Sequence, residues 1–558
     1  MEEARLSFWR RYRWLEWVAG GLLAALAVAA VVVSVLLHQA EPFLRARIVA
    51  ELQERFHARV ELDSFHVSLV NGVWAEGKGL RIWPPAQVAG VTAPGPETTG
   101  PVEPLIHLDE FRFHAPLRYQ PGKPFHVALV ELRGLDVHMP PKSHFAHAAA
   151  QAVGAGESRG GAGLLRFEVD TIECAGVRLV MGTGKPGKQP LEFVIARLKF
   201  TGIASGGAMG FDAELTNPRP VGTIHTTGSL GPWQASDPGE SPLMGDYRFE
   251  HADLAGFKEI AGILSSTGRY KGTLRNLMVD GETDTPDFRL THFGNALALH
   301  TRFHAKVDGT NGDTDLEPVE AMLGRSHFTA QGQIVRVAAA DGTPQNTGHD
   351  IALTVNVDRG RIEDFLRLAS KPRQVMTLLT GAVTAKATLH IPPGPAPVHQ
   401  RLRLNGAFTL TEARFTSAKI QDRMMELSLR GQGRPEDVKK TDPVSVTTAL
   451  QGDFQMADGV ITLPALTCAM PGATINLKGT YGVEGGALNF AGTAKTEATA
   501  SAMVGGWKGM LLKPVDRLFK KDGAGLEVPI HITGTREEPV FDLNLDQFKV
   551  KLRPGEKR

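Results

Sequence analysis

Apolar and polar residues alternate one by one along much of this chain. In "ATINLKGTYGVEGGALNFAGT" (473–493), Ile475 and Leu477 share one side of an extended segment, because successive side chains of a strand point to opposite faces. A glycine-rich turn at 482–486 follows, and Leu488 resumes the alternation. The pattern predicts a β-hairpin with one apolar face and one polar face.

The same alternation recurs along most of the chain and predicts strand after strand. Strands are predicted at 60–69 (with an irregularity at 63–64), 105–114, 125–139 and 164–181. The dipeptides Asn311-Gly312 and Asp458-Gly459 are typical of hairpin turns. Two Pro/Gly/Ala-rich stretches, 84–104 and 148–163, are predicted to be exposed loops. The chain is therefore predicted to be mainly β.

Only a few segments have the periodicity of helices. Leu44, Ile48, Leu52 and Phe56 recur at four-residue spacing, which predicts a short amphipathic helix at about 42–57. Further helices are predicted at 253–265, 361–370 and 501–520. Each of these three lies between runs of strands.

The N-terminal region carries an apolar run from Val18 to Leu37. Twenty residues of helix extend about 30 Å, the thickness of a bilayer core. Arginines precede the run and Trp14 and Trp17 stand at its start, so the chain beyond residue 40 is predicted to lie outside the cytoplasm. A cleaved signal peptide is the alternative, but the run exceeds an ordinary signal core and lacks a good cleavage site. An uncleaved membrane anchor is the preferred interpretation.

Composition narrows the function classes. Of 558 residues, 42% are hydrophobic and 22% are charged, and the net charge of +1 argues against a nucleic-acid-binding protein. The chain has two cysteines, Cys174 and Cys468, which lie far apart in strand-like runs. A disulfide between them is conceivable, but two buried small apolar residues are the simpler interpretation.

Candidate catalytic and metal-binding motifs have simpler explanations. Ser265 and Ser266 lack the Gly-x-Ser-x-Gly spacing of a nucleophile elbow. His144 and His147 have no partner at ligand-like spacing. The acidic run 308–315 lacks the order of an EF-hand loop and is predicted to be a charged turn. The sequence thus predicts no catalytic residues, no metal site and no cofactor, and an anchored hydrolase is disfavoured.

Internal repetition indicates a modular β array. The segments "GETDTPDFRL" (281–290) and "GTREEPVFDL" (534–543) share the spacing Gly-x4-Pro-x-Phe-x-Leu. The apolar face of so many strands must be covered, since each large apolar side chain left in water forgoes roughly 1.5–3 kcal/mol. Three arrangements would cover this face. A second sheet can pack on it, or the sheet can curl and bury the face on itself and a few helices. Alternatively, another molecule can cover it.

The chain resembles the AsmA family of bacterial envelope proteins. The resemblance rests on the anchor followed by "PFLRARIVAELQERFHARVELDSFHVSLVNGVWAEGKGLRIW" (42–83), and on three C-terminal segments. These are "LNGAFTLTEARFTSAKIQDRMMELSLRGQG" (404–433), "GDFQMADGVITLPALTCAMPGATINLKGTYGVEGGALNFAGTA" (452–494) and "VPIHITGTREEPVFDLNL" (528–545). The middle of the chain, about 100–280, matches less well.

This resemblance implies a fold: an N-terminal transmembrane helix, then an elongated, repetitive, curved antiparallel β-sheet or groove with a few short helices. The expected regions are a cytoplasmic N-terminus (1–17), the anchor (18–37), an N-terminal helix plus β region (42–230), a middle β repeat region (231–400) and a C-terminal β region (401–550). It also implies a location in the cytoplasmic membrane with the bulk of the chain in the periplasm.

The function that the resemblance implies is non-enzymatic binding or conduction of lipid during outer-membrane biogenesis. Phospholipid or another envelope lipid, the cytoplasmic membrane and envelope proteins are the expected partners, and nucleic acid is not. Candidate lipid-groove residues are Phe454, Met456, Ile475, Leu477, Val528, Ile530 and Ile532. The alternative is a periplasmic scaffold or assembly factor for outer-membrane proteins, acting through exposed strand edges.

Overall fold

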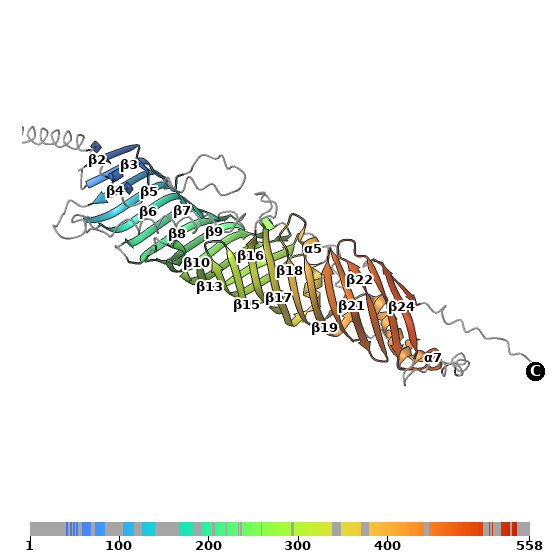
Figure 1. Cartoon of the computed structure of the whole chain (residues 1–558). Coiled ribbons are helices and arrows are strands. Elements are labelled where there is room, and N and C mark those ends of the chain that lie inside the picture. Colours follow the sequence, from blue (N-terminus) through green and yellow to red (C-terminus); the bar gives the residue numbers. More distant parts are fainter. Residues whose placement is uncertain are drawn as a thin grey trace, which may run out of the picture. The chain divides into compact units, whose positions relative to one another are not determined.

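The structure, a computed structural model, describes most of residues 58–543 and several residues of a helix between 41 and 53. The longer stretches outside this description are 1–40, 84–103, 116–124, 140–166, 182–190, 338–347, 370–378, 440–445, most of 506–525, and 544–558. The chain forms two compact units. Figure 1 shows that both units consist mainly of strands. Unit 1 comprises Met1–Gly184, Pro190–Thr216 and His225–Met244; unit 2 comprises Lys185–Gln189, Asn217–Ile224 and Gly245–Arg558.

Unit 1 consists mainly of strands, and the strands predicted at 105–114, 125–139 and 164–181 are confirmed. Its strands are β1 (Val60–Glu61), β2 (Ser64–Ser68), β3 (Val73–Ile82), β4 (Ile106–Ala115), β5 (Phe125–Met139), β6 (Phe167–Met181) and β7 (Leu191–Ile203). The division between the units passes through β8 (Met209–Pro218), β9 (Val221–Leu230) and β10 (Pro242–Asp253), with the 3-10 turn η1 (Pro238–Glu240) before β10. The break between β1 and β2 falls where the sequence pattern is irregular.

The predicted antiparallel sheet contains one parallel pair of strands. Strands β5 and β6 pair in parallel, with Leu132 opposite Cys174. Parallel neighbours need a connection of a dozen or more residues, because the chain must return to the same end of the sheet. The stretch 140–166, which lies outside the described residues, has that length.

Glycines with a left-handed backbone mark a kink that crosses neighbouring strands of unit 1. Gly79 in β3 has a φ of 65° and Gly134 in β5 has a φ of 63°. A Cβ atom at Gly134 would lie 1.9 Å from Oδ2 of Asp109 in β4, so both the backbone angle and the close approach require glycine. Leu80 and Leu108 pair directly beyond the kink, so the strands keep their register across it.

A helix covers one apolar cluster of unit 1. Several residues between 41 and 53 are helical, which confirms the predicted amphipathic helix over its described part. Its Ile48 and Val49 pack against Leu62 and Phe65. Nε of Arg45 donates a hydrogen bond to the carbonyl oxygen of Leu62 at 3.0 Å, which ties the helix to the chain just before β2.

Unit 2 contains β11 and a long antiparallel series of strands. Its strands are β11 (Ile260–Ala261), β12 (Ile263–Thr273), β13 (Asn276–Leu290), β14 (Leu297–Asp308), β15 (Asp313–Leu323), β16 (Ser326–Val337), β17 (Gly348–Arg361), β18 (Leu379–Ile391), β19 (Arg403–Phe415), β20 (Thr448–Ala457), β21 (Val460–Met470), β22 (Ala473–Gly482), β23 (Leu488–Thr496), β24 (Glu527–Gly534) and β25 (Pro539–Leu543). From β12 onward each strand pairs antiparallel with the next. The hairpin predicted at 473–493 is confirmed as β22 and β23, and Asp458-Gly459 joins β20 to β21.

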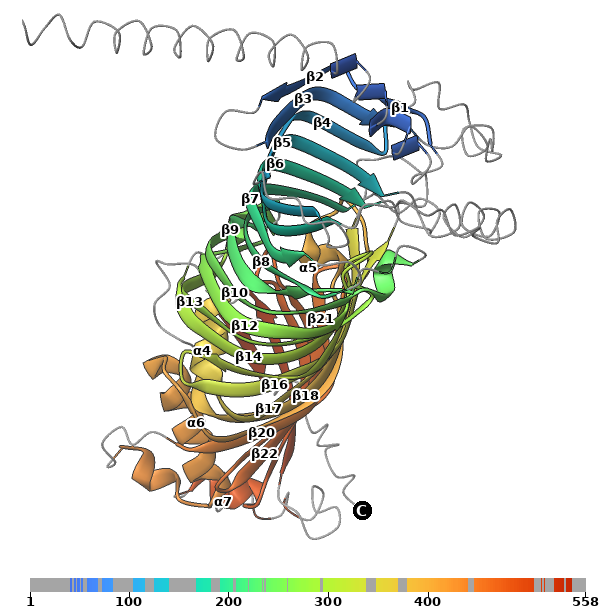
Figure 2. The same ribbon diagram turned by 90° about the vertical axis from the view of Figure 1, so that its left-hand side faces the viewer.

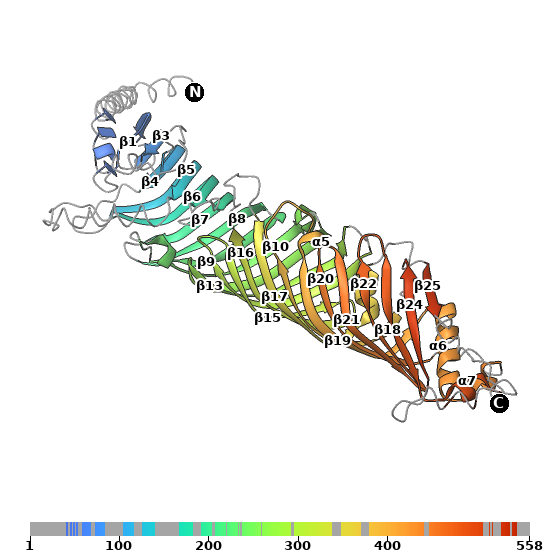
Figure 3. The same ribbon diagram turned by 45° about the vertical axis from the view of Figure 1, so that its right-hand side comes forward.

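The helices of unit 2 are short connectors between strands. They are α4 (Ile362–Leu368), α5 (Val398–Arg401), α6 (Ala418–Gly431) and α7 (Ala500–Val504), with the 3-10 turns η2 (Leu254–Phe257) and η4 (Pro435–Lys439). Figure 2 shows bent strands in unit 2 with α4 and α6 on the same side. In Figure 3, α6 and α7 lie beside the last strands.

The helix predictions succeed only in part. The helix predicted at 361–370 is confirmed as α4, whereas the one at 253–265 is wrong. There, one 3-10 turn is followed by Ile260, which pairs with Leu290 of β13, because strand pairing outweighs local preference. The helix predicted at 501–520 ends after α7 at Gly505, whose φ is 66°, and most of the rest lies outside the described residues.

Candidate functional site

The sheet of unit 2 has an apolar face, here called the inner face and defined by Leu353, Leu389 and Leu410, and an opposite outer face. Leu353 of β17 and Leu389 of β18 are directly opposed. Directly opposed side chains lie about 4.5–5.5 Å apart at Cβ, so they form a continuous surface. The row to which they belong, here called the leucine row, contains Leu316, Gly332, Leu353, Leu389 and Leu404 on β15–β19.

The leucine row extends across neighbouring strands in both directions. The register adds Ala305, Val279 and Tyr270 on β14, β13 and β12, and Met456, Ile461, Tyr481 and Leu488 on β20–β23. At a strand separation of about 4.8 Å, the row follows the sheet for roughly 50 Å. Most of its members are half-buried, while their sequence neighbours on the outer face are mostly exposed.

A second row on the same face is completely buried. This buried row contains Val383, Leu410, Leu450, Cys468, Ile475 and Ala494 on β18–β23. Leu410, with 1% of its surface exposed, is among the most completely buried side chains described. Burial of Cys468 raises the pKa of its thiol from 9.0 to about 11, since the thiolate would form away from water.

Helices α4 and α6 account for the difference between the two rows. Met424 and Leu427 of α6, and Ile362 and Phe365 of α4, pack against the cluster that contains the buried row. The rings of Phe365 and Phe328 lie 6.5 Å apart. One inner face is thus closed by protein at one end of its strands and half-buried toward the other end.

Six of the seven candidate groove residues predicted from sequence have described side chains, which lie on this face at different depths. Phe454, Leu477 and Ile532 are half-buried, whereas Met456, Ile475 and Ile530 are 6–9% exposed. Ile475 and Ile530 belong to the cluster closed by α6, so substitutions there change packing first. Val528 pairs with Ala494 in β24, and its side chain lies outside the described residues.

Of the leucine row, sequence reasoning named only Met456 as a candidate groove residue. The signal of this row is present as alternation in "DIALTVNV" (350–357) and "LRLNGAF" (402–408). Alternation assigns a face within one strand, but it does not say which residues of neighbouring strands are opposed.

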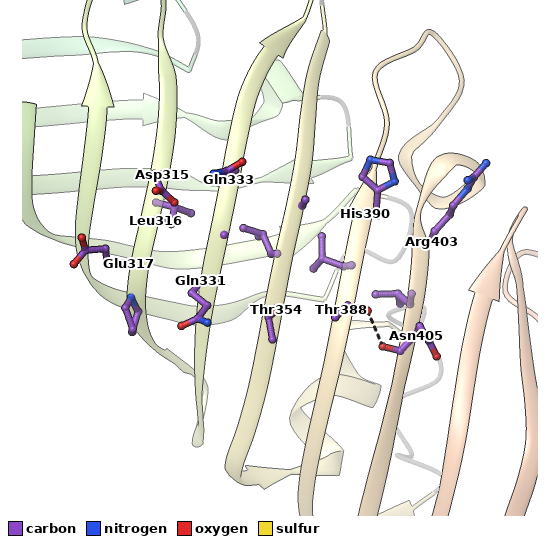
Figure 4. Close-up of a pocket in the computed structure, with 16 residues that line it drawn as sticks. Asp315, Leu316, Glu317, Gln331, Gln333, Thr354, Thr388, His390, Arg403 and Asn405 are labelled. Atoms are coloured by element: carbon purple, nitrogen blue, oxygen red, sulfur yellow. Dashed lines mark hydrogen bonds between the residues drawn. The ribbon is translucent and has the colours of Figure 1, made fainter. Parts of the chain in front are cut away.

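A hollow of about 760 Å³ lies over the same five strands. Each strand contributes a run of successive residues: an apolar residue or Gly332 of the leucine row in the middle and mostly polar residues on both sides, among them Gln331, Thr388 and Asn405 (Figure 4). The hydroxyl of Thr388 donates to the carbonyl oxygen of Asn405 at 3.3 Å. The polar residues and the leucines of each strand point to opposite faces, and both kinds of residue line the hollow.

A segment that joins β18 to β19, here called the strap (392–402), reaches a distant part of unit 2. The backbone N–H of Val398 donates to Oε1 of Glu259 at 2.7 Å, across 139 positions of sequence. Nδ1 of His399 lies 3.8 Å from Oε2 of the same carboxylate. Within the strap, Nε of Arg401 donates to the carbonyl oxygen of Ala396 at 2.7 Å. Glu259 therefore fixes the strap to the segment before β11.

The described residues contain no candidate metal site, because no group of three His, Cys, Asp or Glu residues among them is placed to hold an ion. In the same part of the chain, no helix is long and apolar enough to cross a membrane. The predicted anchor, 18–37, lies outside that part, as do His144 and His147.

No family model, no curated protein and no solved structure matches this chain.

Proposed function

We propose that the protein binds lipid by laying hydrocarbon chains on the leucine row of unit 2. The observation that carries the proposal is the change in burial along a single face. The buried row is closed by α4 and α6, whereas the leucine row is in register over β12–β23 and most of its members are only half-buried. A guest of hydrocarbon would complete the burial of that row.

The energetics favour such a guest. Burial of a CH₂ group stabilises by about 0.8 kcal/mol, so a sixteen-carbon tail gains on the order of 12 kcal/mol when it is fully covered. A bilayer also covers the tail, so the exchange between a bilayer and this face approaches balance as the inner face covers the tail to the same extent. Reversible binding of that kind suits a protein that passes lipid on without covalent chemistry.

The cellular setting of the proposal is the bacterial envelope. The apolar run 18–37 and the AsmA-like segments support an anchor in the cytoplasmic membrane, with the sheet in the periplasm. In that setting the lipid would be a phospholipid or another envelope lipid, carried during outer-membrane biogenesis.

The proposal is tested by photo-crosslinking in intact membranes, before any detergent is added. The photoreactive residue p-benzoylphenylalanine replaces Leu353 on the inner face or, as a matched control, the adjacent exposed Ala352 on the outer face. Mass spectrometry of the irradiated full chain should find lipid adducts at position 353 roughly tenfold above those at 352, which corresponds to about 1.4 kcal/mol.

Two results would contradict the proposal. Equal lipid labelling at both positions would mean that the protein is merely close to a membrane. A protein adduct at position 353 in place of lipid would instead favour the scaffold function, with a partner chain on the inner face.

A further inference from the structure

Arg336 lies on the inner face of the sheet, on the same side of β16 as Gly332 and Ile334. In β16, Gly332, Ile334 and Arg336 alternate with exposed Gln331 and Gln333. The regular pairing of β16 with β17 from Phe328 to Val337 keeps these alternate residues on one side of the sheet. In the described strands β13–β23, outside the bulges, the register places a single charged residue of the types Lys, Arg, Asp and Glu on the inner face. That residue is Arg336.

The guanidinium group of Arg336 is only partly satisfied. Its Nη1 atom is buried and has no hydrogen-bond partner among the described residues. Burial lowers the pKa of Arg336, and the nearby charge of Asp313 opposes this shift. Arginine nonetheless keeps its charge in proteins. A half-buried cation with an unused donor is unfavourable unless an acceptor approaches it.

Arg336 stands at the end of the strands away from α4. It is opposite His349 at the beginning of β17, whereas α4 follows the other end of β17. The strap begins close by, because Pro393 packs beside Gly348. Four residues of extended chain, roughly 13 Å, separate Arg336 from Gly332 in the leucine row. The face thus has a positive charge at one end and hydrocarbon-like side chains beyond it.

We propose that Arg336 binds the anionic head group of an amphiphile whose tail lies on the leucine row. This inference rests on the proposed function and specifies its ligand: a lipid with a carboxylate or phosphate head. Arginine suits both head groups, since its planar donors match the two oxygens of either anion. A lipid with an uncharged head would leave the buried donor of Arg336 unpaired.

The test compares pairs of probes that share a tail and differ in head charge. Photoactivatable palmitate competes with photoactivatable hexadecanol, and phosphatidic acid competes with diacylglycerol, each pair at equal concentration with the full chain in neutral vesicles. The wild-type protein should be labelled at least about tenfold more by the anionic member, because a charge-assisted hydrogen bond is lost with the neutral one. The two pairs distinguish a free fatty acid from a phospholipid as the source of the anion.

Substitutions of Arg336 test whether this residue causes the preference for the anionic probe. Arg336→Gln should reduce the preference to within about twofold while hexadecanol labelling persists, and Arg336→Lys should retain part of it. Arg403→Gln is the matched control, because Arg403 lies at the same end of the strands on the outer face. This variant should keep the wild-type ratio. Chemical unfolding of each variant verifies that it is folded.

The outcomes separate this inference from the proposed function. An unchanged ratio in Arg336→Gln, or no preference in the wild type, would overturn the inference and leave lipid binding intact. If neither tail labels the wild-type protein, the proposed function itself fails.

Discussion

Cys174 in unit 1 and Cys468 in unit 2 are both free and buried, in agreement with the prediction that they are small apolar residues of the core. Burial raises the pKa of each thiol from 9.0 to about 11. The oxygen of Thr448 interacts with the Cys468 thiol and opposes this shift in part. The thiols therefore stay protonated in the folded protein at pH values at which an unfolded chain releases the proton.

This difference predicts a loss of stability in alkali. Between about pH 9 and pH 11 the unfolded state binds fewer protons than the folded state at each cysteine. The free energy of unfolding should then fall by up to about 1.4 kcal/mol per pH unit for each thiol, whereas well below pH 9 the thiols contribute no slope. Chemical unfolding of the full chain at several pH values, in wild type and Cys468→Ala, measures this slope. An identical slope in the two proteins would show that Cys468 does not titrate in this way.

At the scale of elements, strand β19 contains both states of the inner face. Leu404, in the leucine row, is half-buried, and Leu410, in the buried row, is 1% exposed. Met424 and Leu427 of α6 pack against the cluster that contains Leu410. Helix α6 therefore stabilises one end of the face and leaves the leucine row uncovered.

Two alanine substitutions on this strand should differ in cost. Leu410→Ala should lower the free energy of unfolding by about 2–5 kcal/mol through lost contacts and a cavity, and Leu404→Ala by about 1 kcal/mol. Urea unfolding of the two variants checks the difference. Equal costs would indicate that the leucine row is sealed as tightly as the buried row, and the lipid proposal would lose its basis.

The strands were predictable because alternation is a local property, and so was the hairpin turn at Asp458-Gly459, where both residues have positive φ. The helices were less predictable, as 253–265 shows. There the backbone N–H of Ala255 donates a hydrogen bond to Oδ1 of Asp253 at 2.9 Å, at the start of a single 3-10 turn. The chain then forms β11, which pairs with β13. Conversely, α6 was overlooked although Ile420, Met424 and Leu427 have helical spacing. It was included in a β-rich segment on the strength of the strands around it.

At the scale of the molecule, some contacts of unit 2 join segments far apart in sequence. Glu259 meets Val398 of the strap, and Nδ2 of Asn295 donates to the carbonyl oxygen of Arg367, in the last turn of α4, at 3.0 Å. The strap and α4 lie at opposite ends of β18. Local patterns assign residues to faces, but such contacts depend on the accumulated twist of many strands. For the same reason, the sequence pattern assigns the candidate groove residues to the apolar face but does not predict how deeply each side chain is buried.

The attachment of the strap to Glu259 leads to a final prediction. Glu259→Ala removes the acceptor of the Val398 N–H and the charge beside His399, so the strap should open more often. A hydrogen bond to a charged group contributes about 1.5–3 kcal/mol, so hydrogen exchange of amides in 392–402 should accelerate roughly tenfold or more. Glu282→Ala, which removes an exposed pair with Arg302, is the control and should leave that exchange unchanged. If exchange in the strap is the same in both variants, the strap is held by its own contacts, such as those of Arg401, and Glu259 is not what fixes it across the unit.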